Sequence, residues 1–181
     1  MKFTLYVLRH GEAEEKGPQW ETQDDQRPLT VEGIKNVEAA VQGLKRMDVE
    51  FDLVLSSPFV RARQTTEILV RGFDGRPRVD FTDHLTPSGD PRKLIEDIRW
   101  HRMQYCIVLV GHEPYLSKLV GELISGENGS DLTLKKGGMC KLETERLEYG
   151  RCATLKWLLT QKQLRAVGAG ARESDGSKGE K

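Results

Sequence analysis

Short apolar runs alternate along the chain with segments in which apolar residues recur every three or four positions. The runs Phe3–Leu8 and Cys106–Val110 are almost continuously apolar, which is typical of strands covered on both faces of a sheet. Further strands are predicted at Phe51–Ser56, Arg78–Phe81, Gly138–Glu143 and Cys152–Leu159. Between them, the spacing of three to four residues predicts amphipathic helices from Val31 to Leu44, Val60 to Val70, Pro91 to Ile98 and Leu116 to Ile124.

Polar residues mark the ends of several predicted helices. Thr30 is a favourable N-cap for the first, and Asp90 followed by Pro91 is a typical start of another. Gly126 is expected to end the helix that precedes it.

The order of these elements predicts the fold class. Strands that alternate with helices form α/β domains, in which consecutive strands pair in parallel and the helices cover both faces of the sheet. Only a loop separates the last two strands, so they are expected to pair antiparallel at one edge. We therefore expect one layered α/β domain with a mostly parallel sheet and an antiparallel edge.

The composition changes near Gln161. The remaining segment has only two hydrophobic residues larger than alanine, Leu164 and Val167, among many glycine, serine and charged residues. Such a segment buries too little apolar surface to offset the entropy lost on ordering. We therefore predict a folded domain at 1–160 and a mostly disordered tail at 161–181, with the disorder beginning at about Ala166.

Charge and hydropathy limit the partners and the cellular location that are expected for the protein. The 181 residues include 28 Lys and Arg and 28 Asp and Glu, and this balance argues against a nucleic-acid-binding surface. No apolar run is long enough to cross a membrane, and the N-terminus does not have the pattern of a signal peptide. The three cysteines fit reduced thiols better than a disulfide framework. A cytoplasmic location without membrane or nucleic-acid partners is expected.

The candidate chemistry lies where three predicted strands end. The first strand runs into Arg9 and His10, the second leads to Arg61, and Cys106–Val110 leads to His112. In an open α/β sheet the binding crevice lies beyond the carboxyl ends of the strands. A single histidine or arginine there is usually structural or solvated, whereas four such residues in one crevice indicate a functional site.

Two guanidiniums and two imidazoles suit a phosphoryl group with its charged oxygens. The amides at the start of the helix near Arg61 would add further donors. Neighbouring positive charge disfavours protonation of a histidine, so His10 is a candidate nucleophile that would form a phosphohistidine. The sequence shows no pair of carboxylates with metal-ligand spacing.

These residues also carry a resemblance to a known family. The segment Leu8-Arg9-His10-Gly11-Glu12-Ala13 resembles the Arg-His-Gly signature of the histidine phosphatase superfamily. Four further motifs follow in the order and spacing of its SixA-type phosphohistidine phosphatases: Arg27-Pro28-Leu29-Thr30, Ser57-Pro58-Phe59-Val60-Arg61-Ala62 with Gln64-Thr65, Leu85-Thr86-Pro87-Ser88-Gly89-Asp90, and Gly111-His112-Glu113-Pro114 with Leu119-Val120. The resemblance covers Phe3 to about Ile124 and resumes weakly in the last strands.

The resemblance implies a phosphoglycerate mutase-like fold and a metal-independent phosphatase without a cofactor. It implies that Arg9, Arg61 and His112 form the phosphate pocket around the nucleophile His10. Arg27 and Ser57 are implied as substrate contacts.

Gly11 is also assigned to the substrate site. It would let the backbone turn closely beneath His10, with a nearby carbonyl fixing the ring tautomer.

The proton donor is less defined. Larger members of the superfamily resemble one another in having a carboxylate donor between the second and third strands, and this chain has Asp83 and His84 in the corresponding neighbourhood. Both are candidates, and the alternative is that His84 is a solvated loop histidine. A different motif, Cys140 and Arg146 with five residues between them, matches the spacing of cysteine-dependent phosphatases. Two glutamates and the absence of glycine in that loop argue against a cysteine mechanism.

Three functions remain open from the sequence. The preferred one is a phosphatase acting on protein phosphohistidine through phospho-His10. A second is a phosphomonoesterase or mutase acting on a small phosphate ester, and a third is a phosphoprotein-binding module without turnover. The short connection Glu12–Leu29 leaves little chain for a lid, which favours a phosphate presented on a protein surface.

Overall fold

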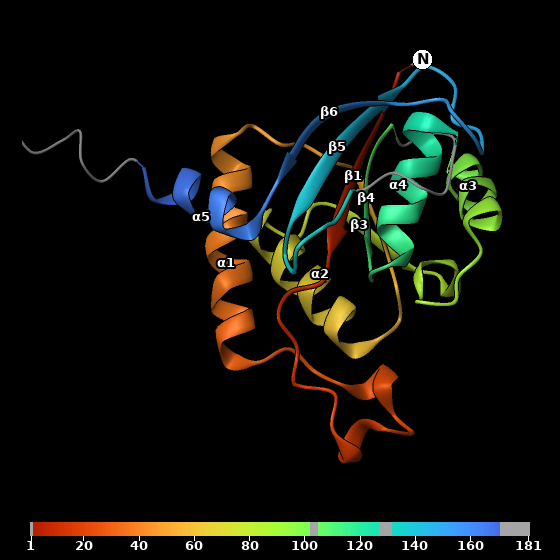
Figure 1. Cartoon of the computed structure of the whole chain (residues 1–181). Coiled ribbons are helices and arrows are strands. Elements are labelled where there is room, and N and C mark those ends of the chain that lie inside the picture. Colours follow the sequence, from red (N-terminus) through yellow and green to blue (C-terminus); the bar gives the residue numbers. More distant parts are fainter. Residues whose placement is uncertain (1, 102–104, 127–131, 171–181) are drawn as a thin grey trace, which may run out of the picture.

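A six-stranded sheet lies between two layers of helices in the computed structural model, which describes residues 2–101, 105–126 and 132–170 (Figure 1). The strands are β1 (Phe3–Arg9), β2 (Leu53–Ser56), β3 (Arg78–Phe81), β4 (Cys106–Gly111), β5 (Met139–Thr144) and β6 (Thr154–Leu159). The helices are α1 (Val31–Arg46), α2 (Val60–Gly72), α3 (Pro91–Trp100), α4 (Tyr115–Ser125) and α5 (Gln161–Ala169). Short 3-10 turns η1 (Pro18–Trp20), η2 (Asp24–Gln26) and η3 (Asp83–Leu85) complete the described elements.

The sheet has the order β3-β2-β4-β1-β5-β6. Strands β3, β2, β4 and β1 pair in parallel, whereas β5 runs antiparallel to β1 and β6 antiparallel to β5. The predicted α/β class, with a mostly parallel sheet, an antiparallel edge and helices on both faces, is confirmed. The two almost continuously apolar strands, β1 and β4, are adjacent at the centre, where both of their faces are covered.

The predicted helix ends are also confirmed. The Thr30 hydroxyl accepts the amide of Gly33 at 2.9 Å, and the Asp90 carboxylate accepts the amide of Arg92 at 2.9 Å. Each bond satisfies an amide that has no partner within the helix. Helix α4 ends at Gly126, whose left-handed backbone (φ 81°) favours glycine.

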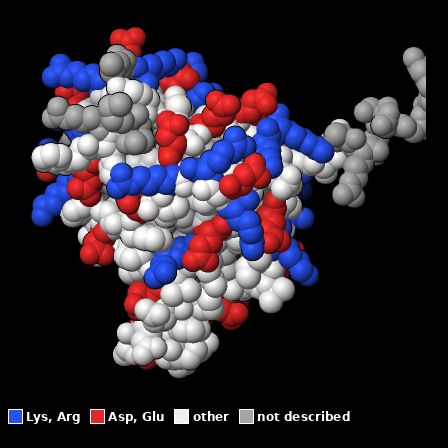
Figure 2. Space-filling model, turned by 180° about the vertical axis from the view of Figure 1, so that it is seen from behind, with Lys and Arg blue, Asp and Glu red and all other residues white. Residues whose placement is uncertain are grey.

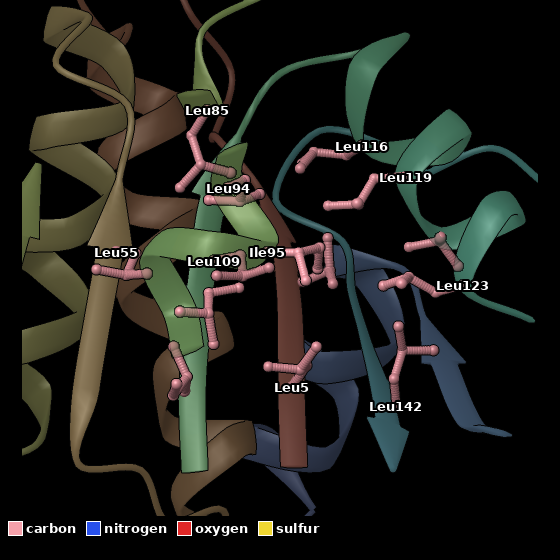
Figure 3. Packing of buried hydrophobic residues seen from close by; sticks show 14 of the residues in the cluster. Leu5, Leu55, Leu85, Leu94, Ile95, Leu109, Leu116, Leu119, Leu123 and Leu142 are labelled. Atoms are coloured by element: carbon pink, nitrogen blue, oxygen red, sulfur yellow. The ribbon is translucent and has the colours of Figure 1, made fainter. Parts of the chain in front are cut away.

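Alternate residues of the strands face two separate hydrophobic clusters. Residues such as Leu5 and Leu109 pack against α3 and α4 (Figure 3). Their neighbours, such as Tyr6 and Val108, pack against α1, α2 and α5 on the opposite face. This division follows from the two-residue period of a strand, which sends successive side chains to opposite faces.

The predicted C-terminal tail is wrong over its first residues. Helix α5 covers Gln161–Ala169, and Thr160 caps it through a capping box with Gln163. Leu164 is fully buried, and Gly43 of α1 provides the space in which the backbone of Leu164 packs closely. The segment has few hydrophobic residues, as its composition shows, but one of them, Leu164, packs against α1. The predicted disorder of residues 171–181 lies outside the described residues.

Charged side chains of both signs are mixed on the surface. Figure 2 shows Lys and Arg interspersed with Asp and Glu over one face of the molecule. Within the described parts of the chain, no helix could span a membrane.

Candidate active site

The carboxyl ends of the three central parallel strands bring the predicted residues to one edge of the sheet. Arg9 of β1 pairs with Gly111 of β4, so His10 and the residue after Gly111 begin side by side. The His10 amide donates to the carbonyl of Gly111 at 3.1 Å, and the Ser57 amide donates to the carbonyl of Val110 at 2.9 Å. His10, Ser57 and His112 each follow a strand by one residue, and they therefore lie together at the carboxyl edge of the sheet, where the sequence places them.

The His10 ring is fixed in one tautomer. Its Nδ1 lies 2.7 Å from the carbonyl oxygen of Gly11, which can only accept, so Nδ1 carries the proton. Nε2 therefore presents a lone pair on the opposite side of the ring. His10 is only 6% exposed, and this burial, together with the charges of Arg61, Arg9 and Arg27, lowers its pKa to about 3 despite the opposing hydrogen bond to Gly11.

The low pKa of His10 was predicted from the neighbouring positive charges, and its direction is confirmed. The larger cause is burial, which disfavours any charged form.

Arg61 lies directly against the lone pair of His10. Its Nε donates to His10 Nε2 at 3.3 Å, and its side chain is 3% exposed in the first turn of α2. Thr65, one turn later, accepts the amide of Gly11 at 3.1 Å and donates to the carbonyl of Arg61 at 2.7 Å. The helix that carries Arg61 is thereby tied to the turn that carries His10.

Gly11 is required for this close packing. A Cβ at this position would come within 2.6 Å of Cγ2 of Val37 and 3.4 Å of Cδ2 of Leu29. Glycine at this position thus lets the backbone that follows His10 pack closely against α1.

His112 faces the same space as His10, with 5.0 Å between the ring centroids. Its Nε2 is hydrogen-bonded to the Ser57 hydroxyl at 2.8 Å. Burial, followed by the charges of His10 and the arginines, lowers the pKa of His112 to about 2. Both rings are therefore neutral at physiological pH.

Two buried nitrogens at the site have no partner among the described residues. They are Nδ1 of His112 and Nε of Arg9. Another nitrogen of Arg9, Nη1, donates to the carbonyl of Leu134 at 2.9 Å, and the Glu113 carboxylate that accepts the Leu134 amide at 3.1 Å fixes this loop. Buried polar atoms without partners are rare because they are costly, and a bound oxyanion could satisfy those of the site.

Arg27 joins the group through a residue that sequence reasoning missed. Arg27 Nε donates to Asp24 Oδ1 at 3.0 Å, and Arg61 Nη2 donates to Asp24 Oδ2 at 2.9 Å. Asp24 lies three positions before Arg27 in η2, a spacing at which two side chains meet on one helical turn. That spacing was the available sequence signal.

The two candidate proton donors are not part of this group of contacts. His84 Nε2 lies 4.0 Å from the carboxylate of Asp97 on α3, and the carboxylate also accepts the Thr82 hydroxyl at 3.0 Å. Asp83 is exposed in η3. Among the described residues, neither Asp83 nor His84 has a hydrogen bond or ion pair to the histidines and arginines of the site.

The cysteine alternative is not supported by the environment of Cys140. Its thiol is fully buried in β5, and burial raises its pKa to about 12. A nucleophilic cysteine requires a thiolate, which this environment disfavours. Within residues 2–101, 105–126 and 132–170, no group of three or more His, Cys, Asp or Glu residues is arranged to hold a metal ion.

Comparison with known sequences relates the chain to histidine phosphatases. The model of the histidine phosphatase superfamily (branch 1) matches residues 5–86. An uncharacterized protein of Picosynechococcus is 34% identical over 142 residues, which cover 77% of this chain and 84% of that protein. The phosphohistidine phosphatase SixA of Escherichia coli is 30% identical over 125 residues, which cover 68% of this chain and 75% of SixA.

Comparison with solved structures extends the similarity over most of the chain. A structure of the protein histidine phosphatase SixA complexed with tungstate matches with a TM-score of 0.76 and 25% identity, over 90% of this chain and 99% of that one. Phosphoglycerate mutase from Bacillus anthracis matches with a TM-score of 0.64 and 14% identity, over 92% of this chain and 96% of the mutase. The second match concerns the fold alone, and it confirms the phosphoglycerate mutase-like architecture.

Proposed function

Because the chain belongs to the histidine phosphatase superfamily, we propose that it removes phosphate from protein phosphohistidine through a covalent intermediate on His10. The observation that carries this proposal is the orientation of the His10 ring. The proton on Nδ1 is held by the carbonyl of Gly11, and the lone pair on Nε2 faces the guanidinium of Arg61. A neutral imidazole that presents a lone pair beside anion-binding donors is equipped to attack phosphorus.

The reaction has two steps in this proposal. His10 Nε2 attacks phosphorus, a P–N bond forms, and the bond from phosphorus to the substrate nitrogen breaks, with the electron pair leaving on that nitrogen. Water then attacks phospho-His10 and the new P–N bond breaks, with its electron pair returning to His10 Nε2. Inorganic phosphate is released and keeps the protons of the water molecule. The donors of Arg9, Arg61, Arg27 and His112 would bind the phosphoryl oxygens and stabilise the transferred group in both steps.

Phosphohistidine is the preferred substrate because of its leaving group. Its imidazole can be protonated on the distal nitrogen before the bond breaks and then leaves as a neutral ring, whereas an alkyl ester needs a positioned acid. The candidate acids are exposed or turned toward Asp97 of α3, which fits a substrate that needs none. The similarity to SixA of Escherichia coli, described as a phosphohistidine phosphatase, points to the same class.

A substrate panel with matched variants tests this function. The full chain, its His10→Ala variant and a His101→Ala control are assayed on a phosphohistidine protein, a phosphoserine peptide and glycerol phosphate. We expect wild type and the control to prefer phosphohistidine strongly and His10→Ala to be inactive. Comparable rates on all three substrates would instead indicate a general phosphomonoesterase.

Trapping the intermediate separates catalysis from simple binding. Brief incubation with ³²P-labelled substrate and quenching without acid should leave an acid-labile label on His10. A chain that binds the phosphoprotein without becoming labelled and without releasing phosphate would be a binding module. Label on Cys140 would refute the histidine mechanism.

A further inference from the structure

Asp24 lies between Arg61 and Arg27 and contacts both of them. We propose that Asp24 is a positioning residue of the phosphatase reaction, which holds the two guanidiniums around the phosphoryl site by bridging them. The inference rests on the proposed function, because it assigns a task to arginines that bind the transferred phosphate. It adds a carboxylate to a pocket that was otherwise predicted to consist of histidines and arginines.

Three hydrogen bonds from the two arginines end on this one residue. Asp24 Oδ2 accepts Arg61 Nη2 at 2.9 Å, its backbone carbonyl accepts Arg61 Nη1 at 2.6 Å, and its Oδ1 accepts Arg27 Nε at 3.0 Å. The side chain of Arg61 is 3% exposed and that of Asp24 is 30% exposed. A bridge of this kind fixes direction as well as distance, because each guanidinium is planar and carries its donors in a rigid fork.

The bridge leaves donors free for a substrate. A guanidinium has five N–H bonds. Arg61 directs three of its N–H groups to His10 and Asp24, so two have no partner among the described residues. Arg27 uses Nε on Asp24 and Nη1 on the carbonyl of Glu14, which leaves three N–H groups without a partner in the described part of the chain. Asp24 therefore binds only some of the N–H groups of each guanidinium. A phosphate could bind the others without displacing Asp24, which favours a positioning role over that of a competing anion.

The bridge also offsets repulsion between like charges. The charge of Arg27 lowers the pKa of Arg61, after the larger effect of burial, so the two guanidiniums oppose each other. Burial opposes the ionised form of Asp24, but the two arginines outweigh it and hold the pKa of its carboxyl below the usual value. An ionised Asp24 allows both arginines to converge on His10, where free side chains of this length would separate.

The local fold fixes Asp24 relative to α2, which carries Arg61. The segment that bears Asp24 leaves the body of the protein at Ala13 and returns at Leu29, and these two residues form an antiparallel bridge. The Leu29 amide also donates to the Gln64 side chain of α2 at 2.7 Å. The segment that contains η2 is thus held against α2 at two points: by the bond between Leu29 and Gln64, and by the bonds between Asp24 and Arg61.

Anion binding by charge-matched variants provides the first test. Asp24→Asn and Asp25→Asn each remove one negative charge, but Asp25 is exposed and its carboxylate accepts from the neighbouring Gln26. Calorimetry with tungstate on the full chain should show binding weakened about tenfold or more in Asp24→Asn. Binding in Asp25→Asn should be unchanged or slightly tighter. If Asp24→Asn binds as tightly as Asp25→Asn or more tightly, Asp24 is a competing anion and the positioning role is refuted.

A double-mutant cycle tests whether Asp24 acts through the arginines. The effect of Asp24→Asn on tungstate binding should be smaller when Arg27 is already replaced by Gln. Fully additive effects would refute the bridge. If circular dichroism shows that Asp24→Asn is unfolded, Asp24→Glu takes its place, because it keeps the charge and moves the carboxylate by one methylene. Weakened binding in Asp24→Glu supports the role, and wild-type binding refutes it.

Turnover separates this inference from the proposed function. On phosphohistidine protein we expect Asp24→Asn to lower kcat about 10- to 100-fold and Asp25→Asn to leave kcat within about twofold of wild type. An active wild type with an equally active Asp24→Asn variant would refute the positioning role alone. A wild type inactive on every substrate, with tungstate binding still lost in Asp24→Asn, would refute the function and leave the role of Asp24 in anion binding intact.

Discussion

The Nε of Arg61 donates a hydrogen bond to Nε2 of His10 over 3.3 Å. The two residues are separated by 51 positions in the sequence and meet because β1 and α2 end and begin at the same edge of the sheet. The contact places the lone pair of His10 against the guanidinium of Arg61. It also makes the shape of the guanidinium, and not only its charge, important for the site.

Replacement of Arg61 by lysine should therefore impair catalysis although the charge is kept. A lysine cannot contact His10 and Asp24 at once through a planar fork. We expect kcat to fall about 100-fold or more, as for loss of a preorganised donor. Arg63→Lys, two residues later on the exposed side of α2, is the matched control and should stay close to wild type. Equal kinetics for the two variants would contradict this account of Arg61.

Two adjacent threonines of α2 should respond oppositely to replacement by valine. Thr65→Val removes the acceptor of the Gly11 amide and should lower the free energy of unfolding by about 1–3 kcal/mol. Thr66 is equally buried, but its hydroxyl has no partner among the described residues. Thr66→Val should thus be neutral or stabilising. Urea unfolding of both variants checks this prediction, which fails if their effects are the same.

The two buried histidines should make the protein less stable in acid. In the folded state the pKa is about 3 for His10 and about 2 for His112, below the usual value of 6.5. Between these lowered values and pH 6.5, the unfolded chain therefore binds protons that the folded chain does not. The free energy of unfolding should consequently fall as pH decreases below 6.5, by up to about 1.4 kcal/mol per pH unit for each histidine. Asp24 and Glu143 have depressed pKa values and lose their stabilising effect only below their ordinary values of 3.8 and 4.5.

The window between pH 4.5 and 6.5 thus isolates the histidines. Urea unfolding across it should give a shallower slope for His10→Asn and for His112→Asn than for wild type. Above pH 6.5 the three proteins should share one pH dependence. A wild-type stability that does not change within the window would show that these rings are protonated in the folded protein.

Helix α5 should contribute measurably to stability. Leu164→Ala removes a fully buried side chain and should cost about 2–5 kcal/mol in thermal or urea unfolding. Val167→Ala, on the exposed side of the same helix, should cost far less. Truncation after Gln163, which the composition alone predicts to be harmless, should destabilise the domain because it removes Leu164. An unchanged melting temperature would contradict the packing of α5 on α1.

Turnover should not depend on a divalent metal ion. The proposed reaction relies on histidine and arginine donors, so dialysis against EDTA should leave the rate on phosphohistidine protein unchanged. Lost activity that Mg²⁺ or Zn²⁺ restores would refute the metal-independent mechanism.

The sequence by itself determined the fold class and the edge at which the site would form. The almost continuous apolar runs of β1 and β4 predicted central strands, because only strands covered on both faces need apolar residues at every position. The carboxyl ends of parallel strands meet at one edge, so His10 and His112 could be placed together from their positions alone. Local signals such as Thr30 and Asp90 also predicted helix starts, since capping depends on neighbouring residues.

Only the tertiary structure decided which side chains complete the site and which segments pack. The three-residue spacing to Arg27 indicates only one contact of Asp24. Its contact with Arg61 spans 37 positions, so no local pattern reveals the bridge between the two arginines. Leu164 is one hydrophobic residue in a polar segment, and its burial depends on the space that Gly43 leaves on α1. His84 matched the position of a proton donor along the chain, yet its ring faces Asp97 of α3. In each case the decisive partner lies on a distant element, and long-range contacts of single residues leave no periodic trace in the sequence.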